Sequence, residues 1–184
     1  PTDTFYSLAA DPLNLKAVER IYDIKSRSRH KPLSLLIESI DQAEELARDL
    51  PDEFYELARK YWPGPLTLIV RAASRLPLKV TANTGNVALR LPASEVAVAV
   101  IRATGSPITA TSASLAGANE CTTAECLREQ MGNRIPLIMN GGPTPRDIPT
   151  TIIDLSHGHD GWQVLREGAI SVQEISELLW RNAE

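Results

Sequence analysis

Hydrophobic positions recur along the chain in two patterns, every third or fourth residue or in short unbroken runs. The first pattern marks the buried face of a helix. It is clearest over residues 14–25, where Asn14 is placed to cap the first turn. The apolar face of this segment consists of Leu15, Val18, Ile21 and Tyr22. We therefore predict a helix over residues 14–25, which ends where a run of cationic side chains begins.

Helix-start signals predict where other helices begin. Asp41 and Glu44 form a D-x-x-E pattern that resembles a capping box. Thr122 and Ser171 each begin a similar T/S-x-x-E pattern. The turn Pro63–Pro65 ends one helix, because proline lacks a backbone donor and clashes with the preceding turn. The helices predicted in this way span residues 41–49, 52–61, 94–104, 123–131 and 172–182.

The short apolar runs predict strands, since such runs bounded by turn residues are typical of strands buried in a sheet. The predicted strands are Leu33–Ile37, Leu66–Val70, Val87–Leu91, Ile108–Thr111, Ile135–Met139, Thr151–Leu155 and Gln163–Arg166. Predicted strands and helices alternate along the chain. The pattern therefore predicts an α/β fold.

The composition indicates one compact domain over residues 1–184. Of the 184 residues, 43% are hydrophobic and 23% are charged, which is enough for a full core. We interpret the Gly/Pro-rich stretch Asn140–Pro145 as a loop within the domain, and the hinge of a lid is the alternative. The chain opens on Pro1 inside a functional-looking motif. We therefore expect the natural N-terminus to be longer.

Charge is distributed unevenly along the chain. The formal net charge of −4 and the pI near 5.5 argue against an extended nucleic-acid surface. The stretch Lys25–Leu33 nevertheless gathers four formal cations and a histidine. Such cations repel one another unless a compact anion, for example a triphosphate, offsets the repulsion. We interpret the cluster as an anion site, and a solvated surface is the alternative.

The cysteines and histidines predict no metal site. Cys121 and Cys126 lie five positions apart and supply no metal quartet, so we expect free cysteines with a structural or incidental role. The three histidines show no zinc spacing. No apolar run approaches the roughly 20 residues of a membrane span, and no signal peptide is recognisable. We therefore expect a cytoplasmic protein.

Two residues are candidate ligand contacts because of their surroundings. Thr4 stands at a predicted strand end, where its hydroxyl either binds a polar ligand group or caps a turn. Arg90 lies within an apolar strand and needs a carboxylate partner, from a ligand or from the protein itself. The segment Thr109–Gly117 offers small residues and hydroxyls for close approach of a ligand, or it is a tight strand-to-helix turn. We assign the aromatic turn Tyr61–Thr67 to architecture.

Seven segments match motifs that occur in one order in a known family. The motifs are P-T-[DE]-T-x-Y-G-L, K-x-R-x-x-x-x-P-L, Y-W-P-G-P-L-T, V-A-x-R-x-P, S-A-N-x-S-G, S-T-[IV]-[IV]-D and L-R-x-G-x-I. The corresponding segments are Pro1–Leu8, Lys25–Leu33, Tyr61–Thr67, Val87–Pro92, Ser112–Gly117, Thr150–Asp154 and Leu165–Ile170. The chain thus resembles the YrdC/Sua5 family of threonylcarbamoyl-AMP synthases over nearly its whole length.

The resemblance implies a single α/β domain with a strongly twisted mixed sheet, flanked by helices around a concave cationic cavity. It implies an L-threonylcarbamoyladenylate synthase, a nucleotidyltransferase. Such an enzyme condenses L-threonine, bicarbonate or CO2 and ATP into threonylcarbamoyl-AMP and pyrophosphate, for the t6A37 modification of tRNA. It further implies partner proteins of tRNA modification, and Mg²⁺ is inferred from ATP alone.

The resemblance also assigns roles to residues. ATP would be held by Arg27, Lys31, Ser112 and Arg166, with Lys25 assisting. Threonine would be contacted by Thr4, Arg90, Ala110 and Thr150. No residue would act as a nucleophile. Instead, Lys25, Arg27 and Lys31 would act by positioning and electrostatics, and the chain has no Walker motif that would bind ATP by a P-loop.

Three positions depart from the family pattern. Ser7 replaces a glycine, Ser114 replaces the asparagine of S-A-N, and Thr150 replaces a serine. A hydroxyl cannot offer the paired donor and acceptor of an amide, so we expect one contact to be lost at Ser114. Two other functions stay open. One is a paralogue that makes a different carbamoyl- or acyl-adenylate, and the other is a non-catalytic module that binds a nucleotide or RNA.

Overall fold

One mixed sheet organises the molecule. In the computed structural model, which describes residues 1–158 and 161–181, seven strands are ordered β1-β5-β2-β4-β3-β6-β7. Parallel pairing joins β2 to β4 and β3 to β6, and the other neighbours are antiparallel. The strands are β1 (Ser7–Leu8), β2 (Ser34–Leu36), β3 (Leu66–Arg71), β4 (Asn86–Arg90), β5 (Ile108–Ser112), β6 (Thr151–Asp154) and β7 (Gln163–Arg166).

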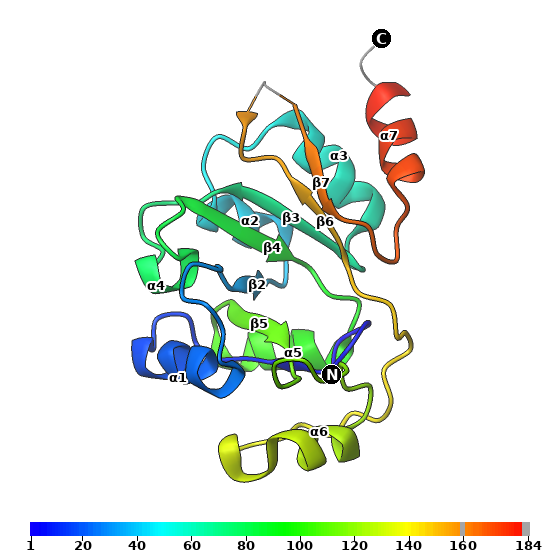
Figure 1. Ribbon diagram of the computed structural model, residues 1–184. Coiled ribbons are helices and arrows are strands. Elements are labelled where there is room, and N and C mark those ends of the chain that lie inside the picture. Colours follow the sequence, from blue (N-terminus) through cyan, green and yellow to red (C-terminus); the bar gives the residue numbers. More distant parts are fainter. Residues whose placement is uncertain (159–160, 182–184) are drawn as a thin grey trace.

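Helices flank this sheet at both ends. They are α1 (Leu15–Lys25), α2 (Ile40–Leu46), α3 (Asp52–Tyr61), α4 (Leu78–Thr81), α5 (Glu95–Thr104), α6 (Ala124–Met131), the 3-10 helix η1 (Gly132–Arg134) and α7 (Val172–Arg181). In Figure 1, α1, α5 and α6 lie near β5, whereas α2, α3 and α7 lie near β3, β6 and β7. The α6–β6 connection, residues 135–150, runs along one side of the molecule in yellow to orange. The predicted α/β fold with a mixed sheet and flanking helices is confirmed.

The core consists of apolar side chains from the sheet and the helices packed on it. Tyr6, Phe54 and Leu68 are among its largest fully buried side chains. Burying a side chain of this size stabilises the fold by about 1.5–3 kcal/mol. The helix α1 buries Val18, Ile21 and Tyr22 as predicted, but Leu15, its first residue, is 41% exposed. The predicted apolar face was therefore one residue too long.

Two of the predicted helix caps are confirmed. The Asn14 side chain accepts a hydrogen bond from the Ala17 backbone N–H at 3.1 Å. The hydroxyl of Ser171 accepts from the Glu174 N–H at 3.2 Å, and the Glu174 carboxylate accepts from the Ser171 N–H at 3.0 Å. This reciprocal pair is a complete capping box, which satisfies donors that the first turn of a helix leaves free.

The other two predicted caps are wrong by one or two positions. Ser39, rather than Asp41, caps α2 by accepting from the Gln42 N–H at 3.1 Å. Thr123, rather than Thr122, caps α6 by accepting from the Cys126 N–H at 3.2 Å. A capping oxygen must reach the second or third amide of the helix, and these hydroxyls do so because each helix begins at the next residue.

The predicted strand Ile135–Met139 is wrong. This segment follows η1, is irregular, and pairs with no strand among the described residues. Pro136 has no N–H to donate to a sheet, and Leu137 is 71% exposed. Together with α5, the segment lines an apolar cavity of about 260 Å³. A short apolar run does not by itself distinguish a strand from a surface segment of this kind.

Other boundaries differ in detail. The helix α2 ends at Leu46 rather than near Asp49, because Ala47 forms a β-bridge with Ala72. The short elements β1, α4 and η1 were not predicted. Residue 182, at the end of the last predicted helix, and His159 lie outside the described residues. Within residues 1–158 and 161–181, the helices are all too short or too polar to cross a membrane.

Candidate functional site

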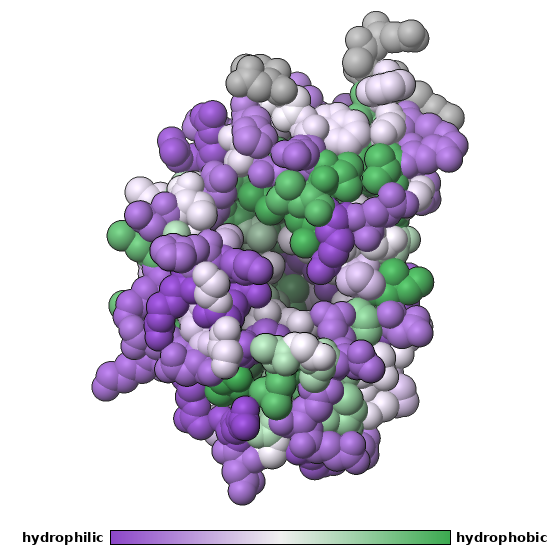
Figure 2. Space-filling model, in the orientation of Figure 1, coloured by the Kyte–Doolittle hydropathy of each residue, from purple (hydrophilic) through white to green (hydrophobic). Residues whose placement is uncertain are grey.

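A cavity of about 210 Å³ brings together seven of the nine residues predicted to bind substrates. They are Thr4, Arg27, Arg90, Ala110, Ser112, Thr150 and Arg166. Figure 2 shows a hollow near the middle of the face drawn, with hydrophilic residues to its left and right and hydrophobic residues above it. The remaining two predicted residues, Lys25 and Lys31, do not line this cavity.

The sheet explains why residues far apart in sequence meet here. Arg90, Ser112 and Arg166 are the last residues of β4, β5 and β7. Thr150 immediately precedes β6, and Arg27 follows the end of α1. Because β4 runs parallel to β2 and β5 runs antiparallel to it, the last residues of β4 and β5 lie toward opposite edges of the sheet. Ser34 and Leu36 of β2, and Ala110 and Ser112 of β5, all line the cavity, and residues two apart on a strand point to the same face. The cavity therefore lies over one face of the curved sheet.

Arg90 is committed to partners within the protein. Its Nη2 donates to Asp3 Oδ1 at 2.5 Å, its Nη1 donates to Thr4 Oγ1 at 3.1 Å, and its Nε donates to the Gly64 carbonyl at 3.0 Å. Burial lowers the pKa of Arg90, and the charge of Asp3 opposes this lowering. Of the two carboxylate sources left open by the sequence, the structure contains the protein's own, Asp3. Three of the five guanidinium donors are used, so two can still meet a ligand in the cavity.

The hydroxyl of Thr4 can only accept a hydrogen bond from a ligand. Thr2 Oγ1 donates its single proton to the Phe5 carbonyl at 2.7 Å. In the Thr2–Thr4 hydroxyl pair, at 3.1 Å, Thr4 is therefore the donor. Thr4 Oγ1 also accepts from Arg90. One lone pair remains, which suits an N–H or O–H group of a ligand.

The hydroxyl of Thr150, in contrast to that of Thr4, can only donate a hydrogen bond to a ligand. Its hydroxyl oxygen accepts from Thr67 Oγ1 at 3.1 Å and from Arg166 Nη2 at 2.8 Å. Both lone pairs are then used, and the hydroxyl proton remains free to donate. Arg166 also donates through Nε to the Thr150 carbonyl at 2.9 Å, and burial lowers the pKa of Arg166. Arg166 is thus fixed in the cavity by two hydrogen bonds to Thr150.

The cationic cluster divides into residues with different roles. Arg27 lines the cavity and is held by the Pro32 carbonyl, which accepts from its Nη2 at 2.8 Å. Lys31 is exposed, and its backbone carbonyl accepts from Tyr22 and Arg27. Arg29 pairs with Asp23 at 2.9 Å on the surface. Part of the cluster is therefore solvated surface, as the alternative prediction had it.

Lys25 binds the protein backbone. Its ammonium donates to the Ser112 carbonyl at 2.5 Å and to the Ser114 carbonyl at 2.8 Å. Burial, followed by the neighbouring charge of Arg27, lowers the pKa of Lys25. The ammonium also donates to Ser112 Oγ at 3.4 Å, so all three of its donors are used in fixing the end of β5 and the start of the loop that follows. Lys25 therefore supports the cavity wall at Ser112 without lining the cavity itself.

Glu120 is a cavity residue that the sequence analysis did not identify. It lines the same cavity as the three arginines Arg27, Arg90 and Arg166. Its charge opposes the lowering of the pKa values of Lys25 and Arg166. Glu120 lies in the loop between β5 and α6, where an acidic residue is ordinarily solvated. The sequence carries no signal that separates it from such a surface charge.

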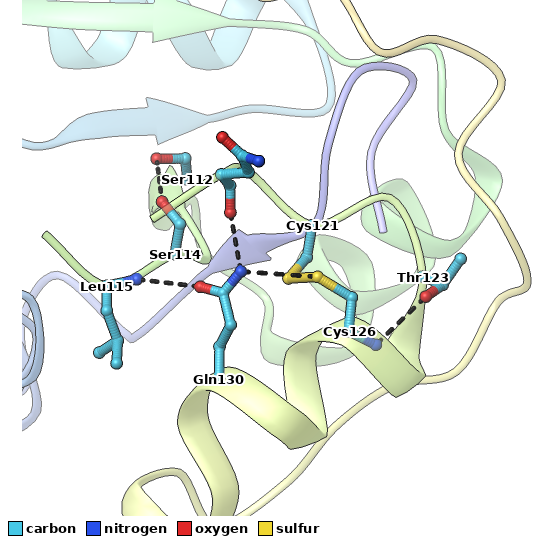
Figure 3. Close-up of a disulfide and its surroundings, with 8 residues drawn as sticks. Ser112, Ser114, Leu115, Cys121, Thr123, Cys126 and Gln130 are labelled. Atoms are coloured by element: carbon cyan, nitrogen blue, oxygen red, sulfur yellow. Dashed lines mark hydrogen bonds between the residues drawn. A yellow bond between two sulfur atoms is a disulfide. The ribbon is translucent and has the colours of Figure 1, made fainter. Parts of the chain in front are cut away.

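Cys121 and Cys126 form a disulfide, with an S–S distance of 2.07 Å, so the prediction of free cysteines is wrong. The start of α6 at Ala124 turns the chain back and brings the two together. Figure 3 shows Gln130 beside the disulfide. Its Nε2 donates to the Asn119 carbonyl at 2.8 Å, and its Oε1 accepts from the Leu115 N–H at 3.2 Å. These contacts fasten the β5–α6 loop to α6.

The remaining predicted segments take structural positions. The aromatic turn is rigid, with Trp62 buried and its Nε1 donating to the Leu66 carbonyl at 2.8 Å. The segment Thr109–Gly117 continues into a loop instead of a tight strand-to-helix turn, since α6 starts only at Ala124. No cluster of metal-ligating side chains occurs in the part of the chain that the structure describes. Cytoplasmic location stays a prediction, and a disulfide is uncommon in a reducing cytosol.

Sheet and cavity together define a class of protein. A curled mixed sheet presents three arginines and several hydroxyls to one cavity. Such a lining is complementary to small ligands that carry anionic groups.

Comparison with known proteins narrows this class to one family. The Sua5/YciO/YrdC family model, described as "Telomere recombination", matches residues 1–168. The chain belongs to this family.

Named relatives agree with this assignment. The threonylcarbamoyl-AMP synthase of Pyrococcus abyssi is 36% identical over 181 residues, which cover 97% of this chain and 52% of the relative. That of Bacillus subtilis is 38% identical over 180 residues, which cover 97% of this chain and 51% of the relative. The chain thus spans about half the length of these two relatives.

Solved structures share the fold. The crystal structure of P. abyssi Sua5 complexed with L-threonine has a TM-score of 0.92 and 36% identity, and the match covers 97% of this chain and 52% of that one. The crystal structure of E. coli YciO has a TM-score of 0.84 and 25% identity, and the match covers 95% of this chain and 84% of that one.

Proposed function

We propose that this chain is a threonylcarbamoyl-AMP synthase domain. It would condense L-threonine, bicarbonate or CO2 and ATP into threonylcarbamoyl-AMP, with release of pyrophosphate, as a nucleotidyltransferase that supplies tRNA modification. The observation that carries the proposal is the single cavity that collects seven predicted substrate contacts. Relatives named for this activity, and a Sua5 structure complexed with L-threonine, support it.

The amino acid would bind at the Arg90 side of the cavity. The two unused donors of Arg90 suit a carboxylate, which an arginine binds best with paired donors. The free lone pair of Thr4 suits the amine or hydroxyl of threonine, and the free proton of Thr150 suits an oxygen. Ala110, buried on β5, would close the pocket through its backbone. An amino acid with a hydroxyl thus matches each remaining donor and acceptor.

The nucleotide would bind at the side formed by Arg27, Ser112 and Arg166. Two arginines placed in this way suit the phosphates. A cavity of about 210 Å³ lies below the range of about 300–1,000 Å³ usual for ligand sites. We therefore expect the phosphates and the amino acid to lie inside and the rest of the nucleotide to extend outward. Lys25 would act by holding the Ser112 loop, and Lys31 would contribute a more distant charge.

The chemistry requires no nucleophile from the protein. The threonine amine attacks the carbon of CO2 and loses a proton, which gives a carbamate. A carbamate oxygen then attacks the α-phosphorus, and the bond from that phosphorus to pyrophosphate breaks. Arg27 and Arg166 would stabilise the negative charge that develops on the phosphate oxygens, and the cavity would hold the two reactants in contact.

A Mg²⁺ ion that accompanies ATP fits the residues present. Glu120 is the one carboxylate among the described residues that line the cavity. Mg²⁺ in such sites is bound mainly by phosphates and waters and needs only one or two carboxylates. Glu120 would therefore be its protein ligand, and the ion would supply positive charge at the phosphates when bound.

Pyrophosphate release from ATP tests the proposal. We expect turnover with L-threonine, bicarbonate and ATP together, and none when either threonine or bicarbonate is omitted. Turnover that does not need threonine would contradict the proposal and would favour a different adenylate-forming activity. An absence of turnover in the complete mixture, with ATP binding retained, would favour a module that binds nucleotides without chemistry.

A further inference from the structure

The two carboxylate oxygens of Asp3 have unequal surroundings. Oδ1 accepts from Arg90 Nη2 at 2.5 Å and from the backbone N–H of Ala93 at 3.0 Å. Oδ2 is buried and accepts no hydrogen bond, and it is the only side-chain atom of this kind among the described residues. Leaving a buried charged oxygen without a donor is unfavourable, so the position of Oδ2 requires an explanation.

Arg146 places a second positive charge beside this oxygen. Its Nη1 lies 3.7 Å from Asp3 Oδ2 and donates to the Asp3 backbone carbonyl at 3.4 Å. The Asp3 side chain is 1% exposed, whereas that of Arg146 is 46% exposed. A shift of roughly 1 Å would bring the pair to an ordinary hydrogen-bond distance. Asp3 therefore lies between two guanidinium groups, Arg90 within the cavity wall and Arg146 outside it.

The α6–β6 connection holds Arg146 in this place. The Tyr6 hydroxyl donates to the Gly142 carbonyl at 2.7 Å, and the Thr144 N–H donates to the Thr122 carbonyl at 2.8 Å. The Thr144 hydroxyl in turn donates to the Arg146 carbonyl at 2.9 Å. Figure 1 shows this connection passing along the side of the molecule between α6 and β6. Arg146 does not line the cavity and so would reach a ligand there only through Asp3.

We propose that Arg146 is a positioning residue for the amino-acid substrate, which acts through Asp3 on Arg90. With charges on both sides, the Asp3 carboxylate is held in the plane that Arg90 requires. Arg90 then keeps its two remaining donors directed at the substrate carboxylate. This inference rests on the proposed function, in which Arg90 binds threonine. It also gives the Gly/Pro-rich connection a role, since it carries the residue that secures the threonine side.

The test compares Arg146→Ala, Arg146→Lys and the control Arg128→Ala. Arg128 is similarly exposed and pairs with Glu125 on α6, away from Asp3. Pyrophosphate release gives the KM for L-threonine and for ATP separately, and calorimetry gives the Kd for L-threonine. We expect Arg146→Ala to raise the KM and the Kd for threonine roughly three- to fivefold, the size expected for a half-exposed ion pair. Arg146→Lys should recover most of this loss.

The KM for ATP and the Tm should stay close to wild type in Arg146→Ala, and Arg128→Ala should change none of these values. Equal rises in both KM values, or a lowered Tm that accounts for the loss, would show a merely structural role and overturn the inference. Unchanged threonine affinity in Arg146→Ala, while the wild-type protein turns over with threonine, would overturn this inference alone. Failure of the wild-type protein to use threonine would instead contradict the proposed function.

Discussion

The hydrogen bonds that a polar residue already makes within the protein decide what it can offer to a ligand in the cavity. Arg90 keeps two donors, Thr4 keeps one lone pair, and Thr150 keeps one proton once their bonds within the protein are counted. Lys25 has no donor left. Whether a hydroxyl can donate to a ligand or accept from it thus depends on the neighbouring groups, and the residue type alone does not determine it.

Replacing Arg27 and Lys31 in turn compares a residue that lines the cavity with one that lies on the surface. Arg27→Ala should raise the KM for ATP roughly tenfold or more, because it removes a half-buried charge from the phosphate side. Lys31→Ala should have a smaller effect, since Lys31 is exposed and lies outside the cavity lining. Steady-state kinetics with ATP varied would measure both. Wild-type kinetics in both variants would remove the proposed anion site.

Substitutions at Thr4 test whether its hydroxyl accepts a hydrogen bond from the ligand. Thr4→Val keeps the shape of the side chain and removes the lone pair, so the Kd for L-threonine should rise about ten- to a hundredfold. Thr4→Ser keeps the hydroxyl and should stay near wild type. Calorimetric titration with L-threonine measures both variants. Equal affinity in Thr4→Val and Thr4→Ser would show that the hydroxyl makes no contact with the ligand.

Residue types in their motifs were enough to predict seven of the residues that line the cavity, including its three arginines. Thr4, Arg27 and Arg166 line it as predicted. Lys25 does not, because its ammonium donates to backbone carbonyls of the protein, and Lys31 does not, because its side chain is exposed. A single sequence records neither fact. Glu120 was missed for the converse reason, since a loop carboxylate and a cavity carboxylate look alike in a single sequence. These differences arise from contacts over long sequence distances.

Among the elements, the β5–α6 loop most directly couples stability to the cavity. It follows Ser112, contains Glu120 and is fastened by the disulfide and by Gln130. Local periodicity predicted the flanking strand and helix well. The disulfide was not predictable from periodicity, because it depends on where α6 starts and turns the chain back.

Removing the disulfide should loosen this loop. Cys121→Ser combined with Cys126→Ser should lower the free energy of unfolding by about 2 kcal/mol, the loop-entropy value for so short a ring. The KM for ATP should also rise, because the loop directly follows Ser112. Chemical denaturation and kinetics measure these effects. Treatment of the wild-type protein with a dithiol reductant should reproduce the change, and a variant with unchanged stability and ATP KM would contradict the role of the disulfide.

The capping box of α7 predicts a pH-dependent contribution to stability. Hydrogen bonds from Ser171 lower the pKa of Glu174 from its ordinary value of 4.5. The stabilisation is therefore fully present above 4.5 and is lost as the pH falls through the lowered pKa of the folded protein. Ser171→Ala should cost about 1 kcal/mol near neutral pH.

Denaturation of wild type and Ser171→Ala at several pH values measures this contribution. The difference in the free energy of unfolding between wild type and Ser171→Ala should become smaller on acidification, as Glu174 becomes protonated. A difference that grows on acidification would contradict the capping-box account. Ser176→Ala, a change within the same helix, is the control, because the Ser176 hydroxyl bonds only the Val172 carbonyl, at 2.9 Å.

At the scale of the whole molecule, the curled sheet turns seven separated motifs into one site. The alternation of runs and periodic segments predicted the α/β class and most strands, because those patterns reflect burial. It did not predict the strand order or that Ile135–Met139 is irregular, since pairing depends on partners distant in sequence. The cavity itself was implied only by the family resemblance. Composition alone predicted no more than a compact acidic domain.

The most direct measurement is mass spectrometry of the adenylate formed from ATP, L-threonine and ¹³C-bicarbonate. We expect a product that contains AMP, threonine and one labelled carbon, and none of it when threonine is omitted. Arg90→Ala should abolish this product, because it removes the carboxylate contact, while ATP binding persists. An adenylate without the labelled carbon, or a labelled adenylate without threonine, would contradict the proposal that this cavity joins these three substrates.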